Sequence, residues 1–174
     1  MKVLALCGSP SPDSATARVL RALARMSRPD HAWTHVEGIG AWPLFTPERL
    51  RAGRPNEIQV LAEAAAEAEL VVVATPEYAH NVPAALKSAL EWLVASGELS
   101  GKPAIAVTST PHAPRGEHAM RSLVATLLAM DARVLAEVPV YGVAAGAIEA
   151  STLEVVDGKL RELLAATLEV GGLV

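Results

Sequence analysis

The sequence predicts an α/β protein with a parallel sheet and helices on both of its faces. Two observations predict this class. Short apolar runs, typical of buried strands, alternate with amphipathic helical patterns through about five strands. The chain has 174 residues, 51% of them hydrophobic, which suits one domain with a substantial core over residues 1–174. No internal repeat or linker-like composition divides it.

The predicted strands are compact apolar runs. Lys2–Cys7 comes first and ends in a Gly-Ser-Pro turn. Leu70–Ala74 gives the strongest pattern because β-branched valines fill its centre. Weaker patterns predict three further strands, the last of them interrupted at Pro139: Trp33–Glu37, Ala104–Thr108 and Ala132–Val140.

Helices are predicted between the strands from apolar spacing and capping residues. Ser14 is expected to cap a helix over Ala15–Met26, and Asn56 is expected to cap one that runs towards Ala68. Pro83 suits the first turn of a helix that ends near Ala95. Two further helices are predicted over Glu117–Met130 and Ser151–Leu168. The stretch Ala41–Pro55 is rich in Pro and Arg, and we expect it to be irregular.

Composition excludes several classes of protein. The net charge of −4 argues against a nucleic-acid binder. The single cysteine, Cys7, excludes a disulfide framework, and the histidines lack convincing metal-ligand spacing, so we predict no metal site. The apolar run Val3–Cys7 stops too early for a signal peptide, and no run is long enough for a membrane span. We therefore expect a cytoplasmic protein with neither a membrane nor a nucleic-acid partner.

Ligands of an open parallel sheet bind beyond the carboxyl ends of its strands. Three predicted loops lie at that edge: Gly8–Ala15, Thr75–Val82 and Ser109–Gly116. The first loop places hydroxyl groups just before a helix N-terminus, where free N–H groups and the helix dipole favour a phosphate. An ordinary Ser/Pro turn that caps the helix is the alternative for this loop alone. The loop lacks the G-x-G-x-x-G fingerprint, which argues against a dinucleotide site.

The second loop and the helix after it carry a specific motif. The chain here resembles the NADPH-dependent FMN reductases, whose pattern is T-P-E-Y-N-H-S/G-x-P-G-x-L-K-N-A-x-D-W. The matching residues are Thr75, Pro76, Glu77, Tyr78, His80, Pro83, Leu86, Lys87, Ala89 and Trp92, with Glu91 in place of the usual Asp. Three shorter segments also resemble the family, so that the similarity covers most of the chain: Gly8-Ser9 with Ser14, Trp42–Phe45, and Gly101–Pro103.

The resemblance implies a flavodoxin-like doubly wound fold, FMN as cofactor and NADPH or NADH as co-substrate. It implies hydride transfer through the flavin to a small-molecule acceptor: a quinone, an azo compound, a metal oxyanion or free flavin. No side chain is expected to act as general acid or base, so no catalytic residue is predicted. The implied cofactor-binding residues are Ser9, Ser11, Ser14 and Thr16 for the phosphate, and Thr75, Pro76, Glu77, Tyr78, Ser109 and Thr110 for the ring.

Three departures from the family pattern leave alternatives open. Ser11 stands where the family has Arg, Thr16 where it has Asn, and Ala79 where Asn follows the tyrosine. Loss of the Arg removes a charge-assisted contact to phosphate. The alternative function is a non-enzymatic flavodoxin-like binding protein with an altered flavin site. An electron carrier is a weaker alternative, because such carriers are usually more acidic and lack T-P-E-Y.

Trp92 and Leu93 provide more apolar surface than one core needs. In the resembled family this helix and the one after the fourth strand pack against their copies in a dimer, so the resemblance implies a homodimer or homotetramer. Burial within the monomer is the alternative reading of these two residues.

Overall fold

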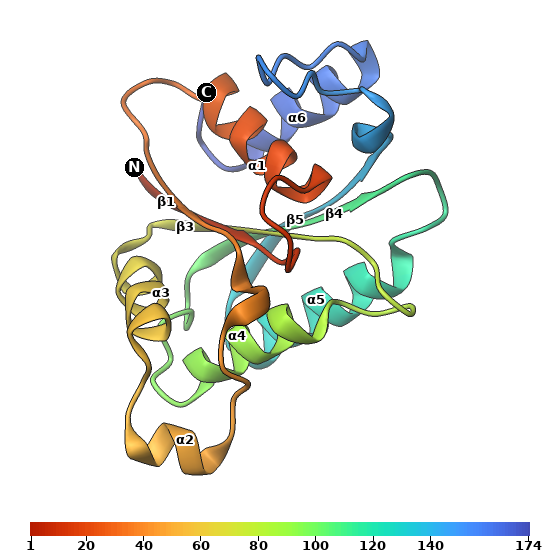
Figure 1. Ribbon diagram of the computed structural model, residues 1–174. Helices are drawn as coiled ribbons and strands as arrows, with labels where there is room; N and C mark the ends of the chain where they lie inside the picture. The colour runs from red at the N-terminus through yellow and green to blue at the C-terminus, as the bar shows by residue number, and fades with distance from the viewer.

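A five-stranded sheet forms the centre of the computed structural model, which describes residues 1–174 (Figure 1). Its strand order is β2-β1-β3-β4-β5, and every neighbouring pair is parallel. This is the order of the flavodoxin-like doubly wound folds, so the predicted fold class is confirmed. The strands are β1 Lys2–Cys7, β2 Ala32–Val36, β3 Leu70–Thr75, β4 Pro103–Thr110 and β5 Arg133–Tyr141.

Helices cover both faces of the sheet, as predicted. Two of them, α1 Ala15–Met26 and α6 Gly158–Val170, pack on one face (Figure 1). Three pack on the other face: α3 Asn56–Glu67, α4 Ala84–Val94 and α5 Glu117–Ala129. The short elements are α2 Pro47–Ala52, which lies away from the sheet, and the 3₁₀ turns η1 Ile39–Ala41 and η2 Val143–Ala145.

Two apolar cores lie on opposite sides of the sheet because successive strand side chains point to opposite faces. In β3, Val71 and Val73 join the core under α3, α4 and α5, whereas Leu70 and Val72 join the core under α1 and α6. Every residue of β3 is buried, which explains its uninterrupted apolar sequence. This central strand therefore places its C-terminal loop in the middle of the ligand-binding edge.

Helix boundaries correct several sequence predictions. Ser14 is the N-cap of α1 as predicted, and its hydroxyl accepts from the Ala17 N–H at 3.1 Å. Asn56 is not a cap, because the N-cap position of α3 is Pro55 and no side chain caps it. The last helix does not begin at Ser151. It begins at Gly158, where Asp157 caps it, while the preceding residues form a bridge between Ile148 and Val155.

The strands and the Pro-rich stretch bring further corrections. Pro139 does not interrupt β5, because β5 is an edge strand and tolerates a residue without an N–H. Strand β4 runs to Thr110, so Ser109 and Thr110 belong to the strand and not to the loop. The stretch Ala41–Pro55 is irregular only in part, since it contains the short helix α2, which Thr46 caps and Pro47 starts.

The segment Trp42–Phe45 packs on α4. The Trp92 indole Nε1–H donates to the carbonyl of Pro43 at 3.0 Å, and the Phe45 ring meets the indole edge-on at 5.5 Å. Ser88 Oγ accepts the Phe45 N–H at 2.7 Å. Trp92 is therefore buried within the monomer, as is Leu93, so the intramolecular reading of these residues is correct.

Candidate functional site

Three segments that follow β1, β3 and β4 lie at the carboxyl edge of the sheet: residues 8–14, 76–82 and 111–116 (Figure 1). They belong to three adjacent strands, so the topology brings them next to one another. These are the loops in which the sequence predicted the site, except that the first two are one residue shorter and the third is two residues shorter.

The first segment holds hydroxyl groups at the start of α1. Ser9 and Thr16 are both 2% exposed. Ser9 Oγ accepts the Ser11 N–H at 3.3 Å, and Ser14 Oγ accepts the Ala17 N–H. A hydroxyl that accepts one hydrogen bond still has its own O–H to donate. These internal bonds therefore orient the serine hydroxyls and leave their protons for an anion.

The electrostatics of this segment suit a phosphate. The N–H groups of the first helical turn have no partner inside a helix, and they form its positive end. The one acid of the segment, Asp13, is paired with Arg21 at 3.2 Å, and Arg21 also binds Glu37. Arg18, half-buried on the first turn, is in none of the ion pairs and leaves a positive charge close by. Ser11 is exposed and supplies no charge where the family has Arg.

The second segment is a tight hairpin. Thr75 is fully buried, and its hydroxyl donates to the carbonyl of Pro76 at 2.9 Å, so its side chain shapes the loop. Tyr78 and Asn81 exchange two backbone hydrogen bonds of 2.9 Å. Between them Ala79 and His80 have φ of +48° and +58°, as in a type I′ turn. The turn leaves Tyr78 half exposed at the edge of the sheet.

Glu77 points away from solvent, with a side chain only 6% exposed. Its Oε2 accepts the backbone N–H groups of His118 and Ala119 at the start of α5, each at 3.1 Å. Burial opposes the charged form, but N–H groups of Ala119, Gly116 and His118 and the nearby His80 outweigh it and lower the pKa of Glu77. Because the Glu77 carboxylate is bound to α5, only the backbone groups of Glu77 are available for the predicted contact with the ring.

The third segment follows Ser109 and Thr110, which are buried at the end of β4. The Thr110 hydroxyl donates to the carbonyl of Arg115 at 2.9 Å and so closes the loop on itself. Gly116 ends the loop with φ of +101°, and a Cβ there would lie 3.1 Å from Thr108 Oγ1. Only glycine lets α5 start this close to β4 without strain.

Cys7 lies beside the first segment, and its Sγ is 3.8 Å from Ser14 Oγ. The side chain is completely buried, and burial raises the pKa of the thiol. Cys7 is therefore a buried structural thiol, because reactive cysteines are exposed and have a lowered pKa.

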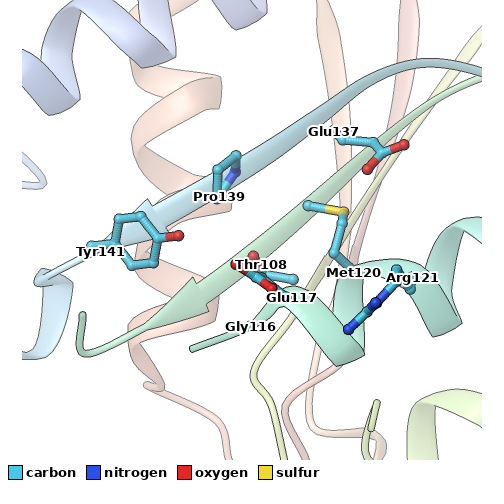
Figure 2. Close-up of a pocket in the computed structure, with 8 residues that line it drawn as sticks. All are labelled: Thr108, Gly116, Glu117, Met120, Arg121, Glu137, Pro139 and Tyr141. Atoms are coloured by element: carbon cyan, nitrogen blue, oxygen red, sulfur yellow. The ribbon is translucent and has the colours of Figure 1, made fainter. Parts of the chain in front are cut away.

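A cavity of about 400 Å³ lies between α5 and the last two strands (Figure 2). The Thr108 hydroxyl, which is buried and has no hydrogen-bond partner, lines it. None of the predicted cofactor-binding residues does. Sequence reasoning missed this cavity because its lining residues are scattered over β4, α5 and β5 and form no motif: Thr108, Gly116, Glu117, Met120, Arg121, Glu137, Pro139 and Tyr141.

The parallel sheet with strand order β2-β1-β3-β4-β5 defines a flavodoxin-like protein. The family model of the NADPH-dependent FMN reductases matches residues 1–164. The chain belongs to this family. It is an oxidoreductase that uses FMN together with NAD(P)H. No helix of the chain is both long and apolar enough to cross a membrane.

Relatives and solved structures agree with this assignment. A quinone reductase of Escherichia coli K12 is 30% identical over 162 residues, which are 90% of this chain and 86% of the relative. An NAD(P)H-dependent FMN reductase of Pseudomonas aeruginosa is 27% identical, over 97% and 92% of the two chains. The structure of a flavoenzyme NAD(P)H:(acceptor) oxidoreductase from Paracoccus denitrificans matches with a TM-score of 0.85 at 20% identity, over 99% and 98% of the chains, and supports the fold.

Proposed function

We propose that the carboxyl edge of the sheet holds FMN, with the phosphate at the start of α1. The observation that carries this proposal is the pair of buried hydroxyl residues, Ser9 and Thr16, beside the capped first turn of α1. Ser9, Ser14 and Thr16 donate their hydroxyl protons to the phosphate, and Ser11 offers a further hydroxyl from the exposed side of the loop. Arg18 adds the nearest unpaired positive charge.

The isoalloxazine ring is assigned to the walls built by the other two segments. Pro76 and Tyr78 provide apolar and aromatic surface, and the backbone of Glu77 provides polar groups for the edge of the ring. Ser109 and Thr110 close the opposite side from the end of β4, while Thr75 supports the loop from beneath. Bound FMN supplies the redox chemistry by accepting hydride from NAD(P)H and delivering it to the acceptor. The protein binds and orients the ring, and no side chain acts as general acid or base.

Quinones are the acceptor class that we propose. The E. coli relative is a quinone reductase, and a Burkholderia relative, 29% identical over 92 residues, is a 2-hydroxy-1,4-benzoquinone reductase. A half-exposed Tyr78 at the edge of the site suits a planar aromatic acceptor, which stacks on exposed rings. Azo compounds, metal oxyanions and free flavin are the other acceptors to compare.

Reconstitution with FMN tests the function. The purified protein is expected to turn yellow with one equivalent of FMN and to oxidise NADPH when a benzoquinone is added. The same assay with an azo dye, chromate and free FMN ranks the acceptors. A protein that stays colourless and takes up no FMN would contradict the proposed site, and turnover with chromate or free flavin alone would contradict the choice of quinones.

We further propose a homodimer in the cytoplasm, where NAD(P)H is available. Val94 on α4 and Leu128 on α5 are each 57% exposed, on the two helices that line a groove together near their C-terminal ends. Exposed apolar residues on adjacent helices are typical of an interface with another protein. Packing of α4 and α5 against a second copy would cover both residues.

A further inference from the structure

Helix α5 lacks an N-terminal cap of its own. Its N-cap residue is Gly116, and no side chain from its own end accepts a hydrogen bond from the first turn. The first N–H groups of a helix need acceptors from outside it. Glu77 supplies one from 41 residues away, because its carboxylate accepts the N–H groups of His118 and Ala119.

We propose that Glu77 is a positioning residue that clamps the loop 76–82 to the start of α5. Its side chain is nearly buried, so water does not compete for the two bonds. Around the carboxylate, the His80 ring lies 3.7 Å from Oε1 and stacks edge-on against the His118 ring at 4.7 Å. Residues of loop 76–82 and of the start of α5 thus surround one carboxylate. The two segments assigned to the walls of the flavin site are therefore held together through Glu77.

The clamp also determines which helix N-terminal N–H groups remain free to bind an anionic group of a ligand. The His118 and Ala119 N–H groups, a ready site for an anion, are occupied by the protein's own carboxylate. In helix α1 the cap Ser14 occupies only the Ala17 N–H, so the N–H groups of Ala15 and Thr16 remain without an acceptor. The negative group of the cofactor is therefore directed to α1, and α5 serves only as a support. This inference rests on the proposed function.

Hydrogen exchange of the apoprotein tests the clamp without any cofactor. In Glu77→Ala the two N–H groups lose their acceptor, so amide exchange is expected to rise roughly tenfold or more in both residues 76–82 and residues 116–120. Exchange in residues 8–20 should not change. Glu77→Gln keeps a neutral acceptor at the same place and should restore part of the protection. Glu117→Ala removes an exposed carboxylate from the same helical turn and is the matched control.

Binding assays test whether the clamp positions the ring. In Glu77→Ala the Kd values for FMN and riboflavin are expected to rise by the same factor, roughly tenfold, whereas the Kd for inorganic phosphate stays unchanged. A general loss of structure would weaken phosphate binding as well. Unchanged exchange in residues 116–120, or an unchanged riboflavin Kd, would overturn the inference. Wild-type protein that binds no FMN would instead overturn the proposed function, and the exchange data would still decide whether the clamp exists.

Discussion

Ala79 and His80 adopt left-handed backbone conformations that cost most non-glycine residues about 1–2 kcal/mol. Asn tolerates this region better, and Asn is the residue that the resembled family has at position 79. The Asn that the family has at this position therefore favours the left-handed backbone conformation, in addition to any contact with the ring. The hairpin that presents Tyr78 is held in a strained turn by the hydrogen bonds between Tyr78 and Asn81.

Ala79→Asn is expected to stabilise the protein by about 0.5–1 kcal/mol, because Asn relieves strain at positive φ. Urea denaturation measures the change in the free energy of unfolding. Ala95→Asn is the matched control, since Ala95 is exposed but has a right-handed conformation. It should give no gain. A lower stability of Ala79→Asn than of the wild type would contradict the strain argument.

Glu77 makes stability depend on pH. Its folded pKa is lowered below the unfolded value of about 4.3, so its stabilising contribution is complete above that value and is lost as pH falls through the folded pKa. Between about pH 5 and about pH 3 the wild type should lose more unfolding free energy than Glu77→Gln, which has no proton to gain. Parallel slopes for the two proteins in chemical denaturation would show that Glu77 does not contribute.

Ser11 lies in segment 8–14, where we propose that the FMN phosphate binds, and it supplies no charge at the position where the family has Arg. Ser11→Arg is expected to lower the Kd for FMN roughly tenfold, because a guanidinium adds a charge-assisted hydrogen bond to the phosphate. Its effect on riboflavin, which has no phosphate, should be small. Ser11→Gln, long but neutral, controls for side-chain size. Equal gains for riboflavin and FMN would place the phosphate elsewhere.

Among the elements, α4 holds the segment Trp42–Phe45. Trp92 anchors it by its hydrogen bond to Pro43 and its contact with Phe45. The sequence pattern did not predict this contact, because Pro43 and Trp92 are 49 residues apart. Helix α2 was missed although Thr46 and Pro47 form a good helix start, because the Pro and Arg content of the stretch outweighed a short signal.

Trp92→Ala is expected to cost about 3–5 kcal/mol, since it removes a fully buried aromatic side chain and leaves the Pro43 carbonyl without its donor. Trp92→Phe, which keeps most of the volume, should cost less. Denaturant titrations of both variants measure the difference. A loss under about 1 kcal/mol for Trp92→Ala would mean that the segment is held by other contacts.

The fold was predictable because its determinants are local: the three central strands are apolar runs, and Ser14 caps α1 one residue before it begins. The loops of the candidate site were predictable because they directly follow those strands. The role of Glu77 was not, since its partners lie 41 and 42 residues away and backbone N–H groups leave no pattern in sequence. The start of α6 was misplaced because the bridge between Ile148 and Val155 is a tertiary contact.

At the scale of the whole molecule, the α4–α5 face is the proposed dimer interface. Leu128→Glu is expected to convert the proposed dimer to monomer, because a charge in an apolar interface is costly to desolvate. Light scattering after size exclusion measures the mass. Leu44→Glu is the control, as Leu44 is 58% exposed but lies in the segment before α2. A wild-type protein that is already monomeric would contradict the proposed dimer.

Pro139 limits how two copies of this protein can associate through the edges of their sheets. Strand β5 is open on its outer side, and an open strand is a template on which another chain can add a strand. Pro139 has no N–H to offer, and a register shift lies between Ala104 and Ile105 where β4 and β5 pair. This flank is therefore a poor template for a continuous intermolecular sheet, which leaves the helical faces for self-association and guards the protein against edge-to-edge aggregation.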